Sequence, residues 1–467
     1  MGSFVGLYTG LSGVQAAQAG LDITSHNIAN ANTPGYTRQR VEQAARPTYQ
    51  SLYGPVGTGV DVQDVARLRD QFLDARFRSA VGDNAASTVR AEFLASLERL
   101  GGEPDLGLSA AIGKLWGAAE EWANDPNDPA ARRQVLTELD GIAATFRATA
   151  NAWDQLGTDT AARRDVVIGQ ANDTLTTLAD FNRRLANADP KRVGPDLLDQ
   201  RDMLVDEVAR LTGATARYET NGTVTMTLGG ETLLSFPDGM NPVSLSDDGT
   251  ALQIGGVDLA AGTMSGEIGG LHRTLNDDLP AWRTTLDGLA TTFATAINDL
   301  NEGGRRIDGT AGEPLFAFDV DPDGPGAARS LNLVTTDIAA LAAAGGEVGD
   351  PDPAAFDGTN ARLFADLRTA DLLDADGDPA GTIESQLSDL ITGLAGSVRS
   401  TRAAADAASG VATGAKLARD SQHGVSIDEE MVGLVRYQRA LEANARVMTT
   451  VDQALDTLVN RVGIVGR

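Results

Sequence analysis

Residue types that commonly perform chemistry are sparse in this sequence of 467 residues. There is no cysteine, which excludes disulfides, thiolate metal sites and thiol nucleophiles. The three histidines, His26, His272 and His423, lie in separate segments, and none belongs to an HExxH, Ser-His-Asp or GxSxG arrangement. A Walker loop is also missing, as is a GxGxxG that opens a helix after a strand. The sequence therefore predicts a protein that is not an enzyme and has no catalytic residue, bound metal or cofactor.

Two acidic turns are the best candidates for a metal site. Residues 319–324, DVDPDG, resemble the first half of a calcium loop. The twelfth position of such a loop is Ser330, where a bidentate glutamate is required, and Pro322 stiffens the backbone inside it. A second acidic run at residues 374–378, DADGD, is incomplete in the same way. We expect both to be acidic surface turns without a functional ion.

Charge and hydropathy exclude several classes of partner. The formal net charge is −27, the sequence pI is about 4.4, and no local basic patch compensates for this charge. Nucleic-acid binding is therefore not expected, and neither is binding to an anionic membrane. No window is apolar over the length of a membrane span, so we expect no membrane insertion. The first basic residue is Arg38, so no Sec-type signal peptide is readable, and these features alone predict a cytoplasmic protein.

The clearest periodic pattern lies near the end of the chain, at residues 426–462. Apolar residues recur there every seven positions: Ile427, Leu434, Leu441, Met448, Leu455 and Val462. The companion positions between them are Met431, Gln438, Ala445, Asp452 and Val459. This narrow stripe is typical of a helix that packs along a partner helix. Ser426 and Glu429 predict a capping box at the start of that helix.

The first helix carries a stripe of the same kind. Its members are Phe4, Leu7, Leu11, Val14, Gln18, Leu21, Ser25 and Ile28. Small residues on the adjacent faces permit close helix approach but give poor intrinsic helix stability: Gly6, Gly10, Gly13, Ala16, Ala17, Ala19 and Gly20. We expect the two terminal helices to pack against each other, or against copies of themselves. The alternative is an ordinary helical core that uses both termini.

A turn is predicted directly after the first helix, at residues 30–36, NANTPGY. Pro34 cannot continue a helix, and Gly35 can adopt a positive φ. The chain from Thr37 to about Pro47 has an extended pattern, and residues 54–59 form a turn-rich link. Neither stretch is patterned like a packed core.

The middle of the chain is predicted to be a bundle of long helices with a smaller antiparallel β portion. Helical periodicity returns at Val65 and covers residues 65–100, 108–122, 129–156, 160–187, 195–211, 267–300, 360–370 and 382–420. We interpret Trp116, Trp122 and Trp153 as core residues. Alternating patterns place the β portion at about 214–264 and 305–335. The expected fold is mainly α, with paired, coiled-coil-like terminal helices and a long-helix bundle body.

Two domains are expected from this pattern. Residues 1–62 and 410–467 would form a discontinuous terminal-helix assembly domain. Residues 63–409 would form a mainly helical body domain that contains the β portion.

Motifs at both ends resemble those of a known group of proteins. Residues 11–36, LSGVQAAQAGLDITSHNIANANTPGY, resemble the amino-terminal signature of bacterial flagellar rod, hook and hook-associated proteins. Residues 424–447 contain GVSIDEEM, YQRAL and NARV, which resemble the carboxy-terminal partner of that signature. Residues 37–39, TRQ, and 197–207, LLDQRDMLVDE, resemble in particular the hook-associated proteins of the hook-filament junction.

This resemblance implies a structural subunit of the bacterial flagellum that forms the junction ring between hook and filament. It also implies export through the flagellar type III apparatus without a cleaved signal peptide, and hence an extracellular location rather than a cytoplasmic one. The implied partners are further copies in a homo-oligomeric ring, the hook protein, a second hook-filament junction protein and a cytosolic export chaperone at the carboxy-terminal helix. The expected partner-binding residues are Leu7, Leu11, Val14, Leu21, Ile28, Asn30, Pro34, Tyr36, Ile427, Met431, Leu434, Leu441, Met448, Leu455 and Val462.

Two other functions remain open from the sequence. A flagellar hook or rod axial subunit would share the terminal motifs, but such subunits have β-rich bodies, whereas this body is predicted to be helical. A secreted hydrolase on a flagellar scaffold is a remote alternative, which facing carboxylates in a deep cleft would favour.

Overall fold

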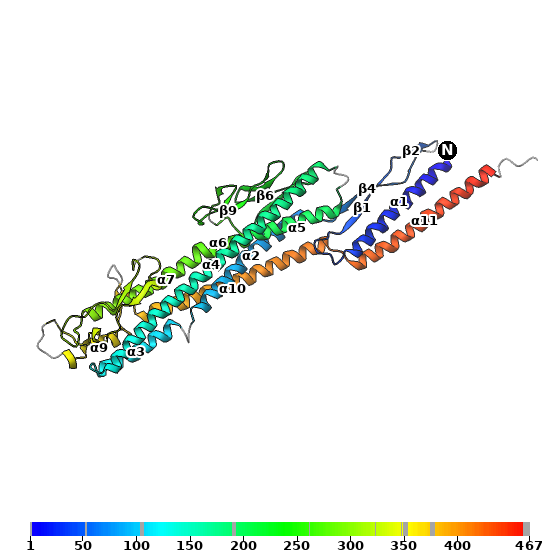
Figure 1. Cartoon of the computed structure of the whole chain (residues 1–467). Helices are drawn as coiled ribbons and strands as arrows, with labels where there is room; N and C mark the ends of the chain where they lie inside the picture. The colour runs from blue at the N-terminus through cyan, green and yellow to red at the C-terminus, as the bar shows by residue number, and fades with distance from the viewer. Residues whose placement is uncertain are drawn as a thin grey trace, which may run out of the picture. The chain divides into compact units, whose positions relative to one another are not determined.

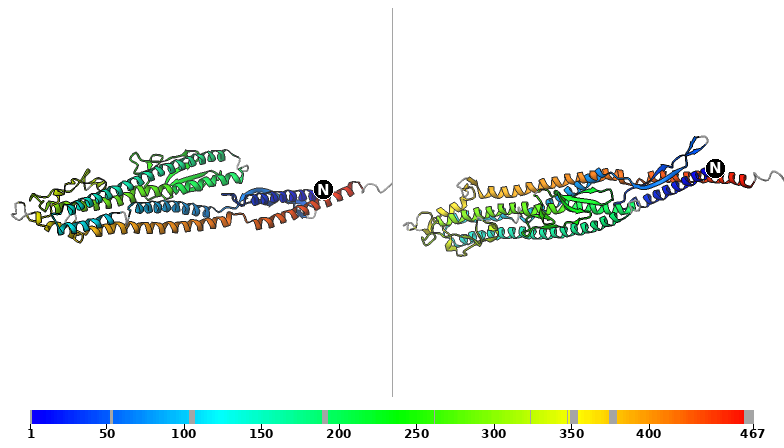
Figure 2. Two further views of the ribbon diagram at one scale, coloured as in Figure 1. Left: turned by 60° about the horizontal axis from the view of Figure 1, so that its bottom comes forward. Right: turned by 90° about the horizontal axis from the view of Figure 1, so that it is seen from above.

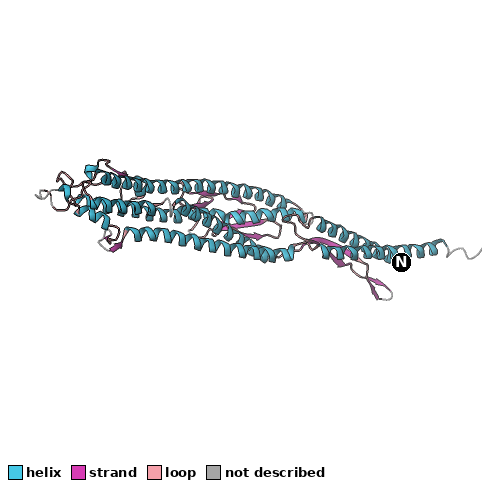
Figure 3. Cartoon of the chain, turned by 90° about the horizontal axis from the view of Figure 1, so that it is seen from below, coloured by secondary structure: helices cyan, strands magenta, loops and turns pink. Residues whose placement is uncertain are grey.

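The structure is a computed structural model that describes residues 2–51, 54–102, 107–188, 193–260, 262–322, 324–346, 348, 354–373 and 379–460. It is mainly helical with small antiparallel sheets, which confirms the predicted fold class (Figure 3). Unit 1 comprises Met1–Asp83, Gln170–Gly266 and Ala408–Arg467, and unit 2 comprises Asn84–Gly169 and Glu267–Ala407. Among the described residues, no helix has the length and apolar character needed to cross a membrane.

Figure 1 shows the helices, which are numbered in the order of the chain. Their bounds are α1 Gly2–Ala29, α2 Gln71–Leu100, α3 Leu108–Asn124, α4 Pro129–Asn187, α5 Pro195–Thr212, α6 Gly266–Arg273, α7 Leu279–Glu302, α8 Ala327–Ser330, α9 Thr359–Asp366, α10 Ile383–His423 and α11 Ile427–Asn460. Short helical turns are η2 Thr274–Asp278, η3 Ile338–Ala340 and η4 Ala354–Phe356.

Several predicted helix boundaries differ from the structure. The helix expected from Val65 begins only at Gln71, because residues 60–67 form a strand that pairs with residues 39–45. The segments expected at 129–156 and 160–187 form the single helix α4, so Gly157 lies inside it. A Cβ at Gly157 would lie 2.6 Å from the Leu279 side chain, and this close packing of α7 explains why a helix-weakening residue stays helical there. The helix expected at 267–300 is interrupted by the π-helical turn η2.

The strands form small antiparallel sheets. In the first segment, β1 (Gln39–Ala45) pairs with β4 (Val60–Arg67), and β2 (Tyr49–Ser51) pairs with β3 (Gly54–Val56). A four-stranded sheet contains β5 (Thr215–Tyr218), β6 (Val224–Leu228), β7 (Glu231–Ser235) and β8 (Gly239–Met240), in that order. A three-stranded sheet has the order β11 (Val257–Asp258), β10 (Leu252–Ile254), β9 (Val243–Leu245). The remaining pairs are β12 (Phe316–Phe318) with β13 (Leu331–Leu333), and β14 (Leu372–Leu373) with β15 (Pro379–Gly381).

In unit 1, the two larger sheets are tied to α4 by asparagine side chains. Asn182 donates to the Val224 carbonyl at 2.8 Å and accepts from the Val224 amide at 2.9 Å, so its side chain pairs with β6 as another strand would. Asn172 makes the same two bonds with Val243 on β9, both at 2.9 Å. Val224, Met226 and Leu228 alternate as buried residues along β6, as the period of two in the sequence predicted.

Unit 2 is built around a large aromatic core. Trp116, Trp122 and Trp153 are all at most 2% exposed, which confirms their interpretation as core residues. The Trp122 ring packs edge-on to Phe364 on α9 with centroids 5.4 Å apart, and the Trp153 indole N–H donates to the Leu97 carbonyl at 3.1 Å. These contacts connect α2, α3, α4 and α9 within one core.

Candidate assembly site at the terminal helices

The two terminal helices pack side by side and antiparallel, which all views of unit 1 agree on (Figures 1 and 2). Glycines of α1 lie opposite large side chains of α11. A Cβ at Gly6 would lie 3.4 Å from Val451, one at Gly10 would lie 2.9 Å from Met448, and one at Gly13 would lie 2.5 Å from Asn444. A Cβ at Gly20 would overlap the ring of Tyr437. The distances at Gly10, Gly13 and Gly20 are shorter than real Cβ contacts, so these three glycines are required for the observed separation of the helices, whereas a Cβ at Gly6 would make an ordinary contact.

The contact face on α1 is therefore different from the predicted stripe. It consists of the small residues at spacings of three and four: Gly6, Gly10, Gly13, Ala17, Gly20 and Thr24. Ala17 and Thr24 are each 4% exposed, whereas Leu11 is 40% exposed, and Gln18 and Ser25 are exposed as well. The apolar residues of the predicted stripe lie on a flank of α1, because glycine allows the closest backbone approach and so determines which face meets α11.

The contact face on α11 agrees with half of the predicted pattern. Leu434, Leu441, Met448 and Leu455 are partly buried, as expected for the seven-residue repeat. The companion positions differ: Met431, Gln438, Ala445 and Asp452 are exposed, and the contact face is completed by Tyr437, Asn444 and Val451. The contact positions beside the repeat therefore lie on its other side from the predicted companions, and they are occupied by an aromatic, a polar and an apolar residue.

The other candidate residues fall into three groups. Leu7, Val14, Leu21, Ile28, Asn30 and Tyr36 are partly buried. Pro34 is exposed, and Ile427 and Met431 are 51% and 49% exposed. Val462 and the side chain of Val459 lie outside the residues described.

A third side of α1 is covered by the strands that follow it. The Val60 amide at the start of β4 donates to the Ser12 hydroxyl at 3.2 Å, and Ser12 donates to the Thr9 carbonyl at 2.8 Å. Ser12 is 3% exposed, so this contact belongs to the interior. The segment predicted to be extended is thus a strand pair that returns along α1.

The turn after α1 is formed as predicted. The Thr33 amide donates to the Asn30 carbonyl at 2.9 Å, and the Tyr36 amide donates to the Thr33 carbonyl at 3.2 Å. Gly35 has a φ of 79°, in the region that favours glycine. A Cβ there would also overlap Met203 on α5, so the turn needs glycine for its conformation and for its packing.

Asn27, near the end of α1, organises the polar contacts below this turn. Its side-chain oxygen accepts from the Tyr36 hydroxyl at 2.7 Å and from the Gln39 amide at 3.0 Å. Its side-chain nitrogen donates to the Gln39 carbonyl at 2.9 Å and to Glu430 of α11 at 3.1 Å. All hydrogen-bonding atoms of this buried side chain are therefore used, which stabilises one arrangement of α1, β1 and α11.

Two residues near Asn27, Tyr36 and Arg38, have raised pKa values. Burial raises the pKa of Tyr36, and the carboxylates of Asp196, Asp199 and Glu430 raise it further, so its hydroxyl remains a hydrogen-bond donor. Burial alone would lower the pKa of Arg38, but its hydrogen bond to Glu429 and the charge of Glu430 raise it above its usual value. Arg38 donates to Glu430 at 2.7 Å and to Glu429 at 2.6 Å, so it remains a cation that holds the start of α11.

The predicted capping box at Ser426 is only half formed. The Ser426 hydroxyl accepts from the Glu429 amide at the long distance of 3.4 Å. The Glu429 carboxylate accepts from Arg38 instead of capping the Ser426 amide. Arg38, just before β1, has replaced the local partner that sequence spacing suggested.

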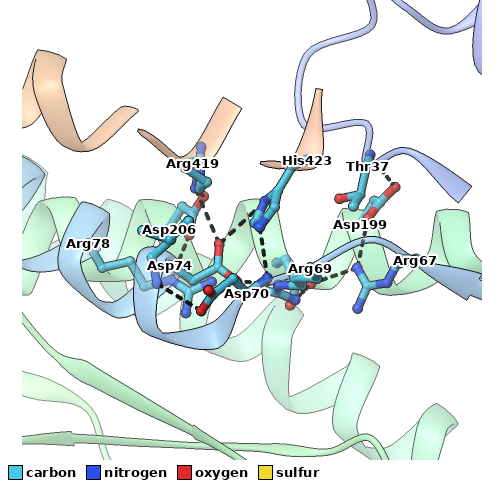
Figure 4. A network of polar contacts seen from close by, with 12 residues as sticks. Thr37, Arg67, Arg69, Asp70, Asp74, Arg78, Asp199, Asp206, Arg419 and His423 are labelled. Atoms are coloured by element: carbon cyan, nitrogen blue, oxygen red, sulfur yellow. Dashed lines mark hydrogen bonds and ion pairs between the residues drawn. The ribbon is translucent and has the colours of Figure 1, made fainter. Parts of the chain in front are cut away.

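A buried network of arginines and aspartates joins this region to α5 (Figure 4). The Thr37 amide donates to Asp199 at 3.0 Å, and Arg67 donates to Asp199 at 2.7 Å and to Asp202 at 2.8 Å. Arg69 pairs with both Asp202 and Asp74. Because these carboxylates and guanidinium groups neutralise one another, the charges are tolerated inside the protein.

Tyr218 lies in the middle of this network. The Arg201 guanidinium lies 4.5 Å from its ring centroid and that of Arg69 lies 4.9 Å away, and the Tyr218 hydroxyl donates to Asp202 at 3.0 Å. Burial lowers the pKa of Arg201 to about 10, and the nearby cations Arg67 and Arg69 contribute to this decrease. Asp202 is thus the acceptor shared by several cations that could not be buried without it.

The network extends to the end of α10. Arg419 donates to Asp206 of α5 at 2.7 Å, and Arg78 of α2 donates to the other oxygen of Asp206 at 2.6 Å. The Arg419 guanidinium also lies 3.6 Å from the ring centroid of Phe77. The polar network therefore connects α1, β1, α2, α5, α10 and α11 within unit 1.

The sequence motif at 197–207 supplied these buried acids, but its role was not predicted. Asp199, Asp202 and Asp206 occur at spacings of three and four, which places them on one face of α5. That regular spacing, together with the occurrence of Arg67, Arg69 and Arg78 within one short stretch, is the signal that could have identified the network. These arginines lie more than a hundred residues before the aspartates of α5, so the sequence alone could not pair them.

Only part of the first candidate metal turn lies among the described residues. In the part of the chain that the structure describes, no group of three or more potential ligands could hold a metal ion. Asp319 accepts from Asn332 at 3.1 Å, which connects the two strands of the β12–β13 pair. Residue 323 and the acidic run at 374–378 lie outside the described residues. The site offers apolar surface and buried ion pairs, which are features of binding and assembly.

Replacing Gly20 with alanine tests the packing of the terminal helices. Gly20→Ala should lower the hydrogen-exchange protection of α11, because overpacking against Tyr437 costs about 1–3 kcal/mol, more than the gain of about 1 kcal/mol in helix propensity. In a Tyr437→Ala background the same change should increase protection. The matched control is Gly117→Ala in α3, where a Cβ meets nothing within 4 Å. Increased protection from Gly20→Ala in the parent chain would contradict the observed packing.

Replacing Asp202 with asparagine tests the buried network. Asp202→Asn keeps the size of the side chain but leaves several arginines without their shared charge, so the free energy of unfolding should fall by about 3–5 kcal/mol in urea denaturation. The control is Asp180→Asn, which removes an exposed partner of Arg183 and should change that free energy by less than about 1 kcal/mol. Equal effects of the two changes would show that the network does not hold unit 1 together.

Comparison with known proteins identifies related chains. A family profile described as "Flagellar hook-associated protein FlgK helical domain" matches residues 94–316. Profiles described as "Flagella basal body rod protein" and "Flagellar basal body rod FlgEFG protein C-terminal" match residues 7–37 and 421–461. The matches at the two ends coincide with α1 and α11, and the first match covers much of the region between them.

Individual relatives agree with these profiles. Flagellar hook-associated protein 1 of Bacillus subtilis is 27% identical over 516 aligned positions, which cover 100% of this chain and 99% of the relative. Flagellar hook-associated protein 1 of Salmonella typhimurium is 31% identical over 66% of this chain, and the chain spans 58% of that relative's length. The fold resembles the solved structure of the flagellar hook junction protein FlgK from Burkholderia pseudomallei, with a TM-score of 0.63, 16% identity, and coverage of 76% of this chain and 100% of that one.

The terminal motifs alone would have allowed a rod or hook subunit as well as a hook-associated protein. The profile that matches the helical body excludes a general rod or hook subunit. The chain therefore belongs to the family of flagellar hook-associated protein 1, the hook-filament junction proteins of the bacterial flagellum.

Proposed function

We propose that this structural protein of the hook-filament junction enters the flagellum through its terminal helices, as one copy of a homo-oligomeric ring. Family membership confirms that it is a structural protein and not an enzyme, and that its location is extracellular, in the flagellum. The cytoplasmic location suggested by composition alone is therefore wrong. The family also implies that the protein takes part in flagellar assembly with hook and filament proteins.

The observation that supports this proposal is the apolar surface that α1 and α11 leave uncovered in one chain. Leu11 is 40% exposed on α1, and Ile427 and Met431 are 51% and 49% exposed at the start of α11. Val432 and Val435, 71% and 41% exposed, extend the same region of α11. Large apolar surfaces of this kind mark sites of protein–protein interaction.

The inner contact and the outer surface have different roles in this proposal. The glycine face of α1 and the contact face of α11 hold one chain together. The flanking residues Leu7, Leu11, Val14, Leu21 and Ile28 of α1, with Ile427 and Met431 of α11, would contact neighbouring subunits. Leu434, Leu441, Met448 and Leu455 would act indirectly by fixing the position of α11. Asn30, Pro34 and Tyr36 would fix the orientation of the α1–α11 pair relative to the buried network of arginines and aspartates.

The finer partners and the domain division are part of the same proposal. The ring would contact the hook protein on one side and a second hook-filament junction protein on the other, and a cytosolic export chaperone would cover α11 before assembly. Residues 1–62 and 410–467 would act as the terminal-helix assembly domain, and residues 63–409 as the body domain. The exposed apolar residues of α11 support a chaperone contact, because such surface would otherwise promote association in the cytosol.

A charge on the exposed stripe of α1 tests the proposal. Leu11→Asp should leave the free energy of unfolding of the monomer within about 0.5 kcal/mol, because the side chain is already solvated, as is usual for surface changes. Incorporation at the junction should be lost, because an unpaired carboxylate buried between subunits costs several kcal/mol. The measurement is the amount of the variant in isolated hook–filament junctions, together with the amount secreted.

The control for this experiment is Gln170→Asp, which adds the same charge at an exposed position of α4, outside the terminal helices. It should be incorporated normally. If secreted Leu11→Asp also builds stable junctions, the flank of α1 is not an assembly surface.

A further inference from the structure

His423 occupies the corner between α10 and α11 and makes two connections to other segments there. Its Nε2 atom accepts a hydrogen bond from the Asp70 amide, just before α2, at 3.0 Å. Its backbone carbonyl accepts from the Arg38 amide, just before β1, at 2.9 Å. The residue is 8% exposed and is followed by Gly424, whose amide donates to the Asp420 carbonyl and ends α10. One histidine therefore fixes the corner from which α11 leaves (Figure 4).

The hydrogen bond to Asp70 requires a neutral imidazole. Because Nε2 accepts from an N–H group, the ring proton must be on Nδ1, which lies 3.9 Å from an Asp74 oxygen. Adding a second proton would place two N–H groups against each other and remove the acceptor. The bond between His423 and α2 cannot persist in the protonated state.

Burial is the main factor that opposes protonation of His423. Burial lowers the pKa of His423, and the positive charges of Arg69 and Arg419 lower it further. The carboxylates of Asp74 and Asp70 raise it. Asp74 is also paired with Arg69, whose positive charge acts in the opposite direction on His423. The small polar cavity beside the ring, about 80 Å³, has as its charged and titratable lining groups Tyr36, Arg69, Asp74, Asp199, Asp202, Asp206, Arg419 and Asp420.

We propose that His423 is a positioning residue for the terminal helices and a proton-sensitive latch, which closes the α10–α11 corner onto the start of α2 when neutral and releases it when protonated. The effect on assembly rests on the proposed function, whereas the latch itself is a property of the single chain. At neutral pH the closed corner would hold the helix pair α1–α11 in one orientation. Acidification would free α11 to change its direction relative to α2.

The direction of the pH dependence follows from proton linkage. The closed state holds His423 with a lowered pKa, whereas the open state has the ordinary value of about 6.5. The open state therefore binds more protons in the window below pH 6.5. The latch contributes its full stability above that pH and loses it as the pH falls toward the lowered value. Within this window the equilibrium constant for opening should rise about tenfold per pH unit, the slope for uptake of one proton.

Hydrogen exchange of the full-length chain between pH 8 and pH 5, corrected for the intrinsic pH dependence of exchange, tests the latch. Peptides that contain the Arg38 and Asp70 amides should lose protection about tenfold per pH unit below pH 6.5. In His423→Gln the side-chain oxygen can accept from the Asp70 amide but does not titrate, so protection there should not depend on pH. The matched control is His272→Gln in α6 of unit 2, which should keep the pH dependence of the parent chain.

Two results would overturn the latch: protection at Arg38 and Asp70 that is constant from pH 8 to pH 5 in the parent chain, or the same pH slope in His423→Gln. A titration of the His423 ring by NMR in the unmodified chain avoids any dependence on variant folding. It should give a pKa below 6.5, and a value above 6.5 would also refute the proposal. If the latch opens with acid while incorporation at the junction is the same at pH 8 and pH 5, the latch itself is supported and its effect on assembly is refuted. The assembly surface on α1 is tested separately by Leu11→Asp.

Discussion

The rest of unit 1 depends on the close approach of α1 and α11, which glycine makes possible. Gly10, Gly13 and Gly20 leave room for Met448, Asn444 and Tyr437, and no larger residue would fit at these positions without a shift. Glycine weakens an isolated helix by about 1 kcal/mol relative to alanine at each position, so α1 depends on its tertiary contacts for stability. The same choice of contact face leaves the large apolar residues of α1 on its flank. A single sequence feature thus provides both the internal pairing and the surface that we assign to neighbouring subunits.

The buried polar network fixes where this helix pair begins. Asn27 joins α1 to β1 and Glu430, and Asp199 and Asp202 join the neighbouring strands to α5. Ion pairs of this type contribute little net stability, but each partner is costly to remove, so they favour one arrangement over others. Such a specific arrangement suits the proposed ring, in which every copy would present the same surface. His423 adds a titratable contact to this otherwise permanently charged network.

Much of the architecture could be predicted because it is encoded locally. Pro34 and Gly35 define the turn after α1, alternating residues define β6, and the seven-residue repeat of Leu434, Leu441 and Met448 defines the main contact positions of α11. The face of α1 that meets α11 within one chain differs from the apolar stripe, because periodicity ranks faces by hydrophobicity whereas this contact is selected by small size. The network at Asp202 and the corner at His423 depend on pairs distant in sequence, which periodicity cannot reveal. The terminal motifs, by contrast, were sufficient to indicate the family, although the packing of their residues required the structure.

The most direct test of the account is the accessibility of Leu11 before and after assembly. The chain contains no cysteine, so a Leu11→Cys variant would carry a single thiol that a maleimide reagent can report. Labelling is normalised to that of the same sample in denaturant. The account predicts extensive labelling in the monomer, where Leu11 is 40% exposed, and at least about tenfold slower labelling in isolated hook–filament junctions, because closed subunit interfaces exclude solvent. Equal labelling rates in the monomer and in the junction would contradict the assignment of the terminal helices as the assembly surface.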